Sequence, residues 1–387
     1  MVWGYKTFML SLYLMSVILF FALIGLWLYK DRKKIDIKYY ILFTRRTKRF
    51  SNTIDKIAKK SPRFWKAIAT IAILVCFYYM FQGTYLLLTN SYQISLGNIS
   101  ESGLKFVLPS PTGSGANGPG YILVPFWFWI ITIACVLVPH ELSHGIIARA
   151  EKIRLKSVGV LLLAILPGAF VEPDEKQLKK AKTMPRLRVF AAGSGANFLV
   201  AALVFLLVAF IVWPGITSQG IELIYVNQSS PAAMAGMQEG MILTHVNEQP
   251  IKTTYQEYIS GTGYLSEEIG TVLPGDIISF TSDEKTYDIE LGMIGNGPYM
   301  GIIYKPIYRV ESYFLIGTLI PLLTMIWLFS FAIGVFNILP LYPLDGGLMI
   351  EALADRFSKN MSKHITRSIS IIIIIIILFN FIGPSLI

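Results

Sequence analysis

The distribution of charged residues constrains this chain more than any other feature of its sequence. Six stretches contain no Asp, Glu, Lys or Arg for twenty residues or more, and they lie within Thr7–Tyr29, Ala67–Ser100, Gly118–Pro139, Val189–Glu222, Ser312–Leu344 and Ser368–Ile387. Because a helix rises 1.5 Å per residue, each stretch can cross a hydrocarbon core of about 30 Å. Charged residues make up only 15% of the 387 residues, whereas about 25% is usual in a soluble domain. The sequence predicts a polytopic α-helical membrane protein with about six transmembrane helices.

The basic residues indicate how these helices are oriented. Lys30–Lys66 contains 14 Lys and Arg against three Asp, a balance of +11 beside a formal net charge of +10 for the whole chain. By the positive-inside rule we expect this loop in the cytoplasm of a multi-pass cell-membrane protein. Between Ile216 and Lys305, 11 acidic residues stand against three Lys, so we expect this segment outside. We attribute the net positive charge to topology and expect no nucleic-acid partner.

Alternation of the spans from a cytoplasmic first loop gives each helix a direction. The first span lacks a charged leader and a small-residue cleavage site, so we expect a retained helix. The third helix, Tyr121–Ala150, runs inward, the fourth, Val189–Trp213, runs outward, and the fifth, from Tyr313 to about Phe336, runs inward. Val158–Val171 is apolar but too short to span, which predicts a re-entrant or interfacial element. An amphipathic stretch, Leu348–Arg367, is expected to precede the last helix.

The segment Gly215–Arg309 differs from the rest of the chain. It contains strand-like runs bounded by Gly, Pro, Asn and Asp, at Ile221–Val226, Ile242–Val246, Ile277–Thr281 and Tyr287–Leu291. We therefore expect a small inserted α+β domain on the extracytoplasmic side.

The third span ends in the sequence His140-Glu141-Leu142-Ser143-His144. Histidines four residues apart share one face of a helix, so both imidazoles can reach one metal ion while Glu141 reaches the water on that ion. The alternative is a pair of core histidines beside an isolated Glu. Ionisable residues at membrane depth are costly and usually functional, which favours a Zn²⁺ site.

Catalytic zinc usually has three protein ligands, so a third ligand must come from elsewhere in the chain. His245 lies in the outer segment and His364 in a basic stretch, and Asp345 is the only acid embedded in another apolar stretch. The third and fifth helices both run inward, which places Asp345 and the histidine pair at a similar depth. The alternative is an acid in a helix-ending turn. Pro340 and Pro343 exclude a regular helix before Asp345, and irregular backbone at that depth lines cavities.

Three motifs, in this order, resemble the signature of the site-2 protease family of intramembrane zinc metalloproteases. They are His140–His144, Gly193–Asn197 (GSGAN) and Asn337–Gly347 (NILPLYPLDGG). The resemblance covers about Gly120–Asn197 and Phe329–Glu351, and Gly159–Glu175 is similar to archaeal members in particular. Ser194 departs from the pattern, since many members have Pro at this position.

This resemblance implies cleavage of transmembrane segments of other membrane proteins within the lipid bilayer. It implies that His140, His144 and Asp345 are the zinc ligands and that Glu141 is the catalytic acid and base, toward the cytoplasmic side. Asn197 and Asn337 would orient the substrate strand or stabilise the oxyanion. The alternative for both is a structural hydrogen bond to a neighbouring helix.

A second resemblance lies in the outer segment. Ser230–Asn247 (SPAAMAGMQEGMILTHVN) is similar to the PDZ domains of bacterial-type proteases, which bind peptides by strand addition. Tyr255–Val272 is longer than usual for such a domain. The PDZ-like domain would contact a peptide or an ectodomain, and the alternative is a steric filter against bulky ectodomains.

We expect five regions along the chain, with boundaries at 1–116, 117–214, 215–309, 310–350 and 351–387. The catalytic membrane core comprises 117–214 and 310–350, and the PDZ-like domain comprises 215–309. Two other functions stay open: a metal transporter and a catalytically inert, membrane-tethered peptide-binding scaffold. A transporter predicts polar residues along a continuous path, whereas this sequence clusters them at one depth.

Overall fold

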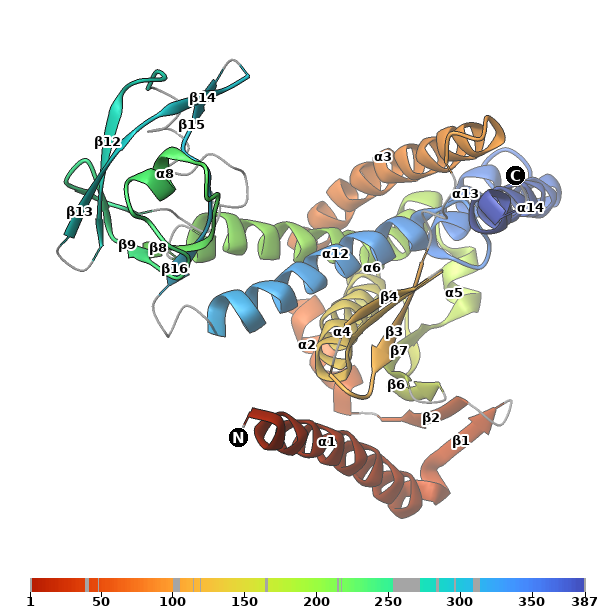
Figure 1. Ribbon diagram of the computed structural model, residues 1–387. Coiled ribbons are helices and arrows are strands. Elements are labelled where there is room, and N and C mark those ends of the chain that lie inside the picture. Colours follow the sequence, from red (N-terminus) through yellow and green to blue (C-terminus); the bar gives the residue numbers. More distant parts are fainter. Residues whose placement is uncertain are drawn as a thin grey trace. The chain divides into compact units, whose positions relative to one another are not determined.

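The computed structural model describes residues 2–38, 42–47, 49–99, 105–113, 115–118, 120–163, 166–213, 216, 218–252, 272–282, 285–295, 297–308 and 314–385. The contacts within the chain divide it into two units, whose elements are labelled in Figure 1. The first unit contains Met1–Ala202 and Met325–Ile387, and the second contains Leu203–Thr324.

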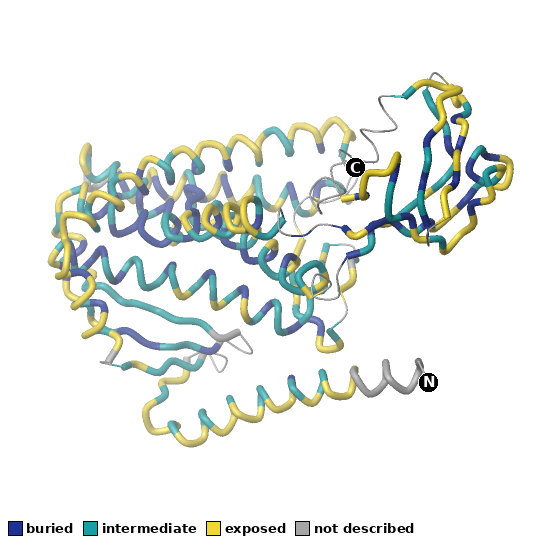
Figure 2. The backbone as a smooth tube through the Cα atoms, turned by 90° about the vertical axis from the view of Figure 1, so that its left-hand side faces the viewer, coloured by how far each residue is buried: buried dark blue, intermediate teal, exposed yellow. Residues whose placement is uncertain are grey.

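Six described helices are long and apolar enough to cross a membrane, as predicted. They are α1 (Val2–Asp31), α3 (Pro62–Ser95), α4 (Phe126–Ala150), α6 (Thr183–Leu207), α12 (Ile320–Ile338) and α14 (Lys359–Ile382), with π-helical turns at Val208–Val212 and Leu315–Leu319. From Leu10 onward, α1 is mostly exposed or half-buried, and Val17 is its one buried residue in this part (Figure 2). Long exposed apolar helices satisfy their own backbone hydrogen bonds and suit a lipid environment. The chain is thus a multi-pass membrane protein.

Three helices begin at other residues than predicted. Tyr121–Pro125 forms strand β5, so the third span begins at Phe126. The fourth begins at Thr183, because Arg186 and Arg188 in its first turns are neutralised by ion pairs with Asp355 and Glu151. The last begins at Lys359, inside the amphipathic stretch. The preceding Ser358 caps it by accepting a hydrogen bond from the N–H of Met361.

A four-stranded antiparallel sheet packs beside α4. Its order is β1 (Ile35–Lys38), β2 (Leu42–Arg46), β6 (Leu155–Leu163) and β7 (Leu166–Pro173). The apolar segment after the third span is therefore a hairpin, and part of the basic loop pairs with it. Gly145 of α4 permits the close approach, since a Cβ there would lie 3.0 Å from Cγ1 of Val171. Strand β7 is the outer strand of this sheet.

The remaining elements of the first unit are short. They are the 3-10 turns Arg32–Lys34 and Gly383–Ser385, α2 (Arg49–Lys60), β3 (Phe106–Ser110), β4 (Ala116–Gly118), β5, α5 (Glu175–Lys180) and α13 (Asp345–Ala354). Small side chains let the helices of the core approach closely. A Cβ on Gly195 of α6, for example, would lie 2.6 Å from Cβ of Ala72 on α3.

The second unit contains every strand-like run that the sequence predicts between 215 and 309. One sheet has the order β16 (Ile302–Tyr308), β8 (Ser218–Val226) and β9 (Ile242–Leu243). Another has the order β11 (Gln249–Pro250), β10 (His245–Val246), β12 (Ile277–Ser282) and β13 (Lys285–Glu290). This unit also contains helix α8 (Pro231–Met234), the hairpin of β14 (Gly292–Ile294) and β15 (Gly297–Tyr299), and the adjoining ends of α6 and α12. Phe280, Leu243 and Ile278 are fully buried in its core. Most of Tyr255–Val272 lies outside the described residues.

Candidate metal centre

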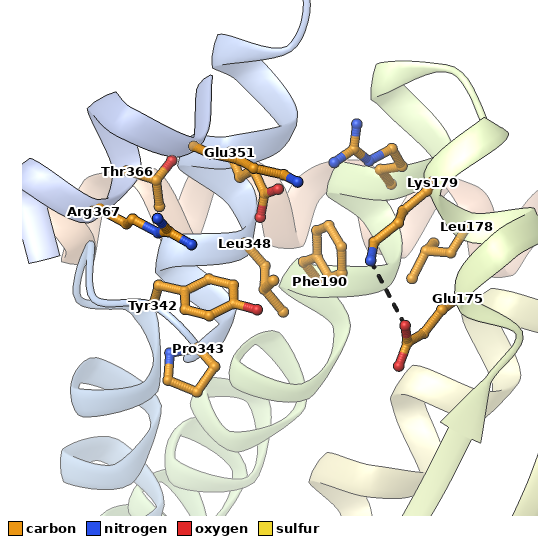
Figure 3. Close-up of a pocket in the computed structure, with 12 residues that line it drawn as sticks. Glu175, Leu178, Lys179, Phe190, Tyr342, Pro343, Leu348, Glu351, Thr366 and Arg367 are labelled. Atoms are coloured by element: carbon orange, nitrogen blue, oxygen red, sulfur yellow. Dashed lines mark ion pairs between the residues drawn. The ribbon is translucent and has the colours of Figure 1, made fainter. Parts of the chain in front are cut away.

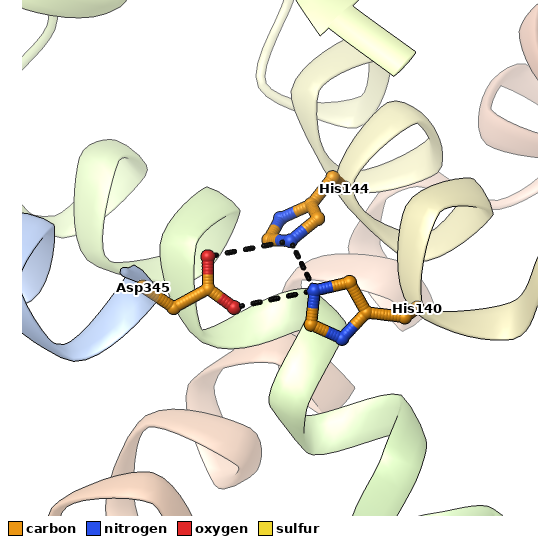
Figure 4. Close-up of side chains that lie close together, drawn as sticks. All are labelled: His140, His144 and Asp345. Atoms are coloured by element: carbon orange, nitrogen blue, oxygen red, sulfur yellow. Dashed lines mark hydrogen bonds and ion pairs between the residues drawn. The ribbon is translucent and has the colours of Figure 1, made fainter. Parts of the chain in front are cut away.

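Two histidines and one aspartate converge between α4 and the start of α13 (Figure 4). The Nε2 atoms of His140 and His144 are 3.3 Å apart. The Asp345 carboxylate places Oδ2 3.5 Å from Nε2 of His140 and Oδ1 3.4 Å from Nε2 of His144. The structure thus brings together the three residues that the sequence predicts as metal ligands.

The position of Asp345 depends on a tight reversal of the chain after α12. Pro340 and Pro343 follow the end of this helix and cannot extend it. Gly346 and Gly347 then pack against that segment. A Cβ on Gly346 would lie 2.0 Å from the carbonyl oxygen of Ile338, and one on Gly347 would lie 2.4 Å from the nitrogen of Tyr342. Only glycine fits at either position, which explains the Asp-Gly-Gly sequence.

Contacts behind the imidazoles hold both rings. The Nδ1 atom of His144 lies 2.7 Å from the carbonyl oxygen of Val189 and donates its proton to it. The Nδ1 atom of His140 lies 3.2 Å from the carboxamide nitrogen of Asn197, which is fully buried. Within the described part of the chain, the carboxamide oxygen of Asn197 has no hydrogen-bond partner. With both Nδ1 atoms engaged, both Nε2 atoms face Asp345.

Two further residues of α6 touch the cluster. A Cβ on Gly193 would lie 2.3 Å from Nε2 of His144 and 2.6 Å from Nε2 of His140, so a side chain there would displace the rings. The Ser194 hydroxyl donates a hydrogen bond of 3.2 Å to Oδ2 of Asp345. Sequence reasoning missed this role of Ser194, although its place beside Gly193 was the available signal.

Glu141 lies on α4 next to the cluster and contacts strand β7. Its Oε2 accepts a hydrogen bond of 3.0 Å from the N–H of Val171. Glu172, the residue after Val171 in β7, accepts a 2.6 Å hydrogen bond from the Ser157 hydroxyl. That bond, with the nearby Lys156, holds the pKa of Glu172 below its usual range. The sequence did not indicate the contact between Glu141 and this strand.

The other candidate side chains stay apart from the cluster. Asn337 is half-buried near the end of α12, and among the described residues no hydrogen bond or ion pair joins it to the three side chains. His245 lies in β10 beside the Thr244 hydroxyl, and His364 is exposed on α14.

The cluster has the chemistry of a metal site. One ligand atom from each of His140, His144 and Asp345 can be chosen so that all three lie within 4.8 Å of one another. Two imidazole nitrogens and one carboxylate oxygen match the usual ligand set of catalytic zinc, which leaves one position for water or substrate.

Comparisons with known proteins identify the family of the chain. An uncharacterized protein of Methanocaldococcus jannaschii is 27% identical over 365 residues, which cover 91% of this chain and 89% of that protein. A membrane-bound transcription factor site-2 protease homolog of Arabidopsis thaliana is 34% identical over 87 residues, which cover 22% of this chain and 16% of that protein. The sequence profile of peptidase family M50 matches residues 128–381, about two thirds of the chain. The chain therefore belongs to peptidase family M50, the site-2 protease family of membrane metalloproteases.

Proposed function

We propose that this protein is an intramembrane zinc metalloprotease that hydrolyses peptide bonds within transmembrane segments of other membrane proteins. The observation that carries the proposal is the convergence of His140, His144 and Asp345. The histidines lie on the membrane-spanning helix α4, and Asp345 lies after the chain reversal that follows α12. The family match supports the peptidase activity. The clustering of these groups at one place argues against a transport path.

The residues of the cluster fit a zinc ion. His144 donates its Nδ1 proton to the carbonyl oxygen of Val189 and presents Nε2 to the carboxylate, as metal-bound histidines do. The absence of a side chain at Gly193 leaves the space in front of both Nε2 atoms open. His140, His144 and Asp345 would hold the ion. Bound zinc supplies Lewis-acid chemistry, which makes water nucleophilic near neutral pH and polarises a carbonyl group.

Glu141 is the proton-transfer group of the proposed reaction. Its Oε2 is held by the N–H of Val171, and within the described part of the chain Oε1 forms no hydrogen bond. Oε1 takes the proton from the attacking water and returns it to the leaving amine.

Strand β7 aligns the substrate in this proposal. It is the outer strand of its sheet, and its Val171 N–H points away from β6 toward Glu141. By the alternation along an antiparallel strand, the N–H of Ala169 points to the same side. A substrate helix must unwind before its carbonyl groups become accessible. An unwound segment that pairs with this edge would be held in an extended form beside the acid-base group.

Asn197 is a positioning residue in this proposal. A rotation of its carboxamide group by half a turn exchanges the amide nitrogen and oxygen, so that the unpartnered oxygen accepts the Nδ1 proton of His140. The oxygen and the Nδ1 proton then both have a partner, and Nε2 of His140 is free for the metal. This role differs from the substrate or oxyanion contact expected from the sequence. Among the described residues no hydrogen bond or ion pair joins Asn337 to the cluster, and we retain the substrate or oxyanion role for it.

The second unit contains the PDZ-like domain of our proposal, at about 215–309, on the extracytoplasmic side. Its two small antiparallel sheets and the Ser230 cap on α8, which accepts a hydrogen bond from the N–H of Ala233, support this assignment. The domain would contact a peptide or an ectodomain of the substrate. The active site would lie toward the cytoplasmic side, in a core formed by 117–214 and 310–350.

The decisive experiment compares the wild type with Glu141→Gln on a reconstituted transmembrane substrate. We expect both proteins to bind one zinc ion, and cleavage by the variant to fall by roughly 10²–10⁴-fold. The matched control is Glu172→Gln, which makes the same change at the residue after Val171, the donor to Glu141. This variant should cleave as the wild type does. Equal cleavage by wild type and Glu141→Gln would contradict the proposal. Zinc flux without cleavage would favour a transporter, and peptide binding without either would favour an inert scaffold.

A further inference from the structure

A polar pocket lies apart from the metal cluster, between α5 and α6 on one side and α13 and α14 on the other (Figure 3). Its volume is about 420 Å³. None of the three clustered side chains lines it. Leu178, Phe190 and Leu348 form apolar parts of its wall, and the rest is mainly charged or polar.

Two buried polar groups in the wall have no hydrogen-bond partner among the described residues. Arg186 is only 7% exposed, and although its Nη1 donates to Asp355 at 2.6 Å, its Nε is unpaired. Thr366 is 2% exposed, and its hydroxyl is unpaired. Burial of an unsatisfied donor is costly. The wall of the pocket thus contains two residues, Arg186 and Thr366, that each have a buried donor without a partner in the described part of the chain.

The rim adds positive charge. Lys363 and Arg367 line the pocket one turn apart on α14, and neither forms an ion pair with a described residue. Lys179 is already paired with Glu175 at 3.7 Å (Figure 3). Glu351 is the remaining acid in the wall. This wall favours an occupant that carries negative charge and accepts several hydrogen bonds, as a phosphate group does.

The pocket lies at the ends of two membrane spans. Arg186 is in the first turn of the span that begins at Thr183, and Lys363 is near the start of the span that begins at Met361. The pocket is therefore at the level of one membrane surface, where lipid phosphates are concentrated. Basic pockets between transmembrane helices at this level bind lipid headgroups.

We propose that this pocket binds the phosphate of an anionic phospholipid headgroup. Arg186 Nε and the Thr366 hydroxyl donate to phosphate oxygens, Lys363 and Arg367 neutralise the charge, and Glu351 accepts from the headgroup hydroxyls. The site is independent of the proposed peptidase reaction.

Lipid binding by the purified full-length chain in detergent tests this proposal. Native mass spectrometry would measure retention of phosphatidylglycerol and of phosphatidylcholine. We expect the double variant Lys363→Gln/Arg367→Gln to bind phosphatidylglycerol at least about tenfold more weakly, since it removes both cations that neutralise the headgroup. The matched control, Lys176→Gln/Lys180→Gln, removes two exposed charges of the neighbouring α5 that do not line the pocket. It should bind as the wild type does.

Thr366→Val separates a ligand contact from a structural role. Because the hydroxyl has no partner within the described chain, its removal should not lower the melting temperature in the absence of added lipid. It should reduce the rise in melting temperature that phosphatidylglycerol causes in the wild type.

Equal losses of phosphatidylglycerol binding in the two double variants would indicate diffuse attraction and overturn the proposal, as would wild-type protein that retains phosphatidylcholine as well as phosphatidylglycerol. So would a Thr366→Val variant whose melting temperature rises with phosphatidylglycerol as much as that of the wild type. Stabilisation by inorganic phosphate equal to that by phosphatidylglycerol would also overturn it, because it indicates a soluble ligand.

Discussion

At the scale of single residues, the group formed by His140, His144 and Asp345 depends on a helix that contributes none of these three side chains. Helix α6 places Gly193 against both imidazoles, Ser194 against Asp345 and Asn197 against His140. Such outer contacts orient ligands and tune metal affinity. The motif 193–197 was visible in the sequence. Its contacts were not, because they depend on how α6 is rotated relative to α4.

The role of Asn197 can be tested by changing its hydrogen bond while keeping its size. Asn197→Leu removes the partner of His140 Nδ1, so we expect zinc affinity to fall roughly 10- to 100-fold. Asn197→Asp keeps an acceptor for the Nδ1 proton and should bind zinc far better than the Leu variant. Competition with a fluorescent zinc chelator measures both. Equal affinity of the Leu variant and the wild type would show that Asn197 does not support the ligand.

Gly193 allows a test of the space in front of the histidines. The Cβ introduced by Gly193→Ala would lie 2.3 and 2.6 Å from the two Nε2 atoms, so we expect the variant to lose zinc and peptidase activity. Gly25→Ala is the control, because a Cβ on this residue of α1 meets nothing within 4 Å. Zinc content after purification gives the measurement. A full complement of zinc in Gly193→Ala would contradict the proposed metal position.

At the scale of elements, the spans were predictable and the hairpin was not. A helix that crosses lipid must be long, apolar and internally hydrogen-bonded, so charge-free stretches of sufficient length identify it. Residues 158–171 are apolar throughout, which hides the period of two that indicates a strand. Strand β6 also pairs with β2, whose Arg45 is opposite Val160 more than a hundred residues later. No local pattern predicts such a register.

The hydrogen bond between β7 and Glu141 gives a prediction at this scale. Val171→Pro removes the N–H that donates a hydrogen bond to Glu141. It removes no hydrogen bond between β7 and β6, because this N–H points away from β6. We expect cleavage to slow roughly tenfold or more, since hydrogen bonds to charged groups contribute about 1.5–3 kcal/mol, while zinc binding stays normal. Val171→Ala keeps the N–H and is the control. Steady-state rates on one substrate, with zinc content in parallel, distinguish loss of acid-base alignment from loss of metal. Unchanged cleavage by the Pro variant would rule out this contact as a catalytic requirement.

At the scale of the whole molecule, the cluster combines residues from both sides of a long insertion. About two hundred residues separate His140 from Asp345, and the match to family M50 extends across both. The predicted topology made this pairing accessible from the sequence, because it has the third and fifth helices run in the same direction and end at a similar depth. The change from apolar spans to short strands likewise indicated the insertion. Its function could not be read in the same way, since a peptide-binding domain and a steric filter share one fold.

Excision of the inserted domain distinguishes these two functions. The ends of the domain lie side by side, because Ser218 of β8 is opposite Tyr308 of β16, so a short Gly-Ser linker can replace residues 218–308. We expect zinc content and cleavage of a substrate without an ectodomain to stay unchanged. Cleavage of the same segment attached to a folded ectodomain should rise several-fold, because the obstacle to its approach is gone.

Glu141→Gln in the shortened chain is the control that assigns any cleavage to this site. If the domain instead captures substrates by a peptide, its excision will slow cleavage of those substrates. Unchanged rates on both substrates would show that the domain does not control access. Comparison of the two substrates in one assay distinguishes an effect on substrate access from a folding defect, because a general loss of folding would lower both cleavage rates and the zinc content together.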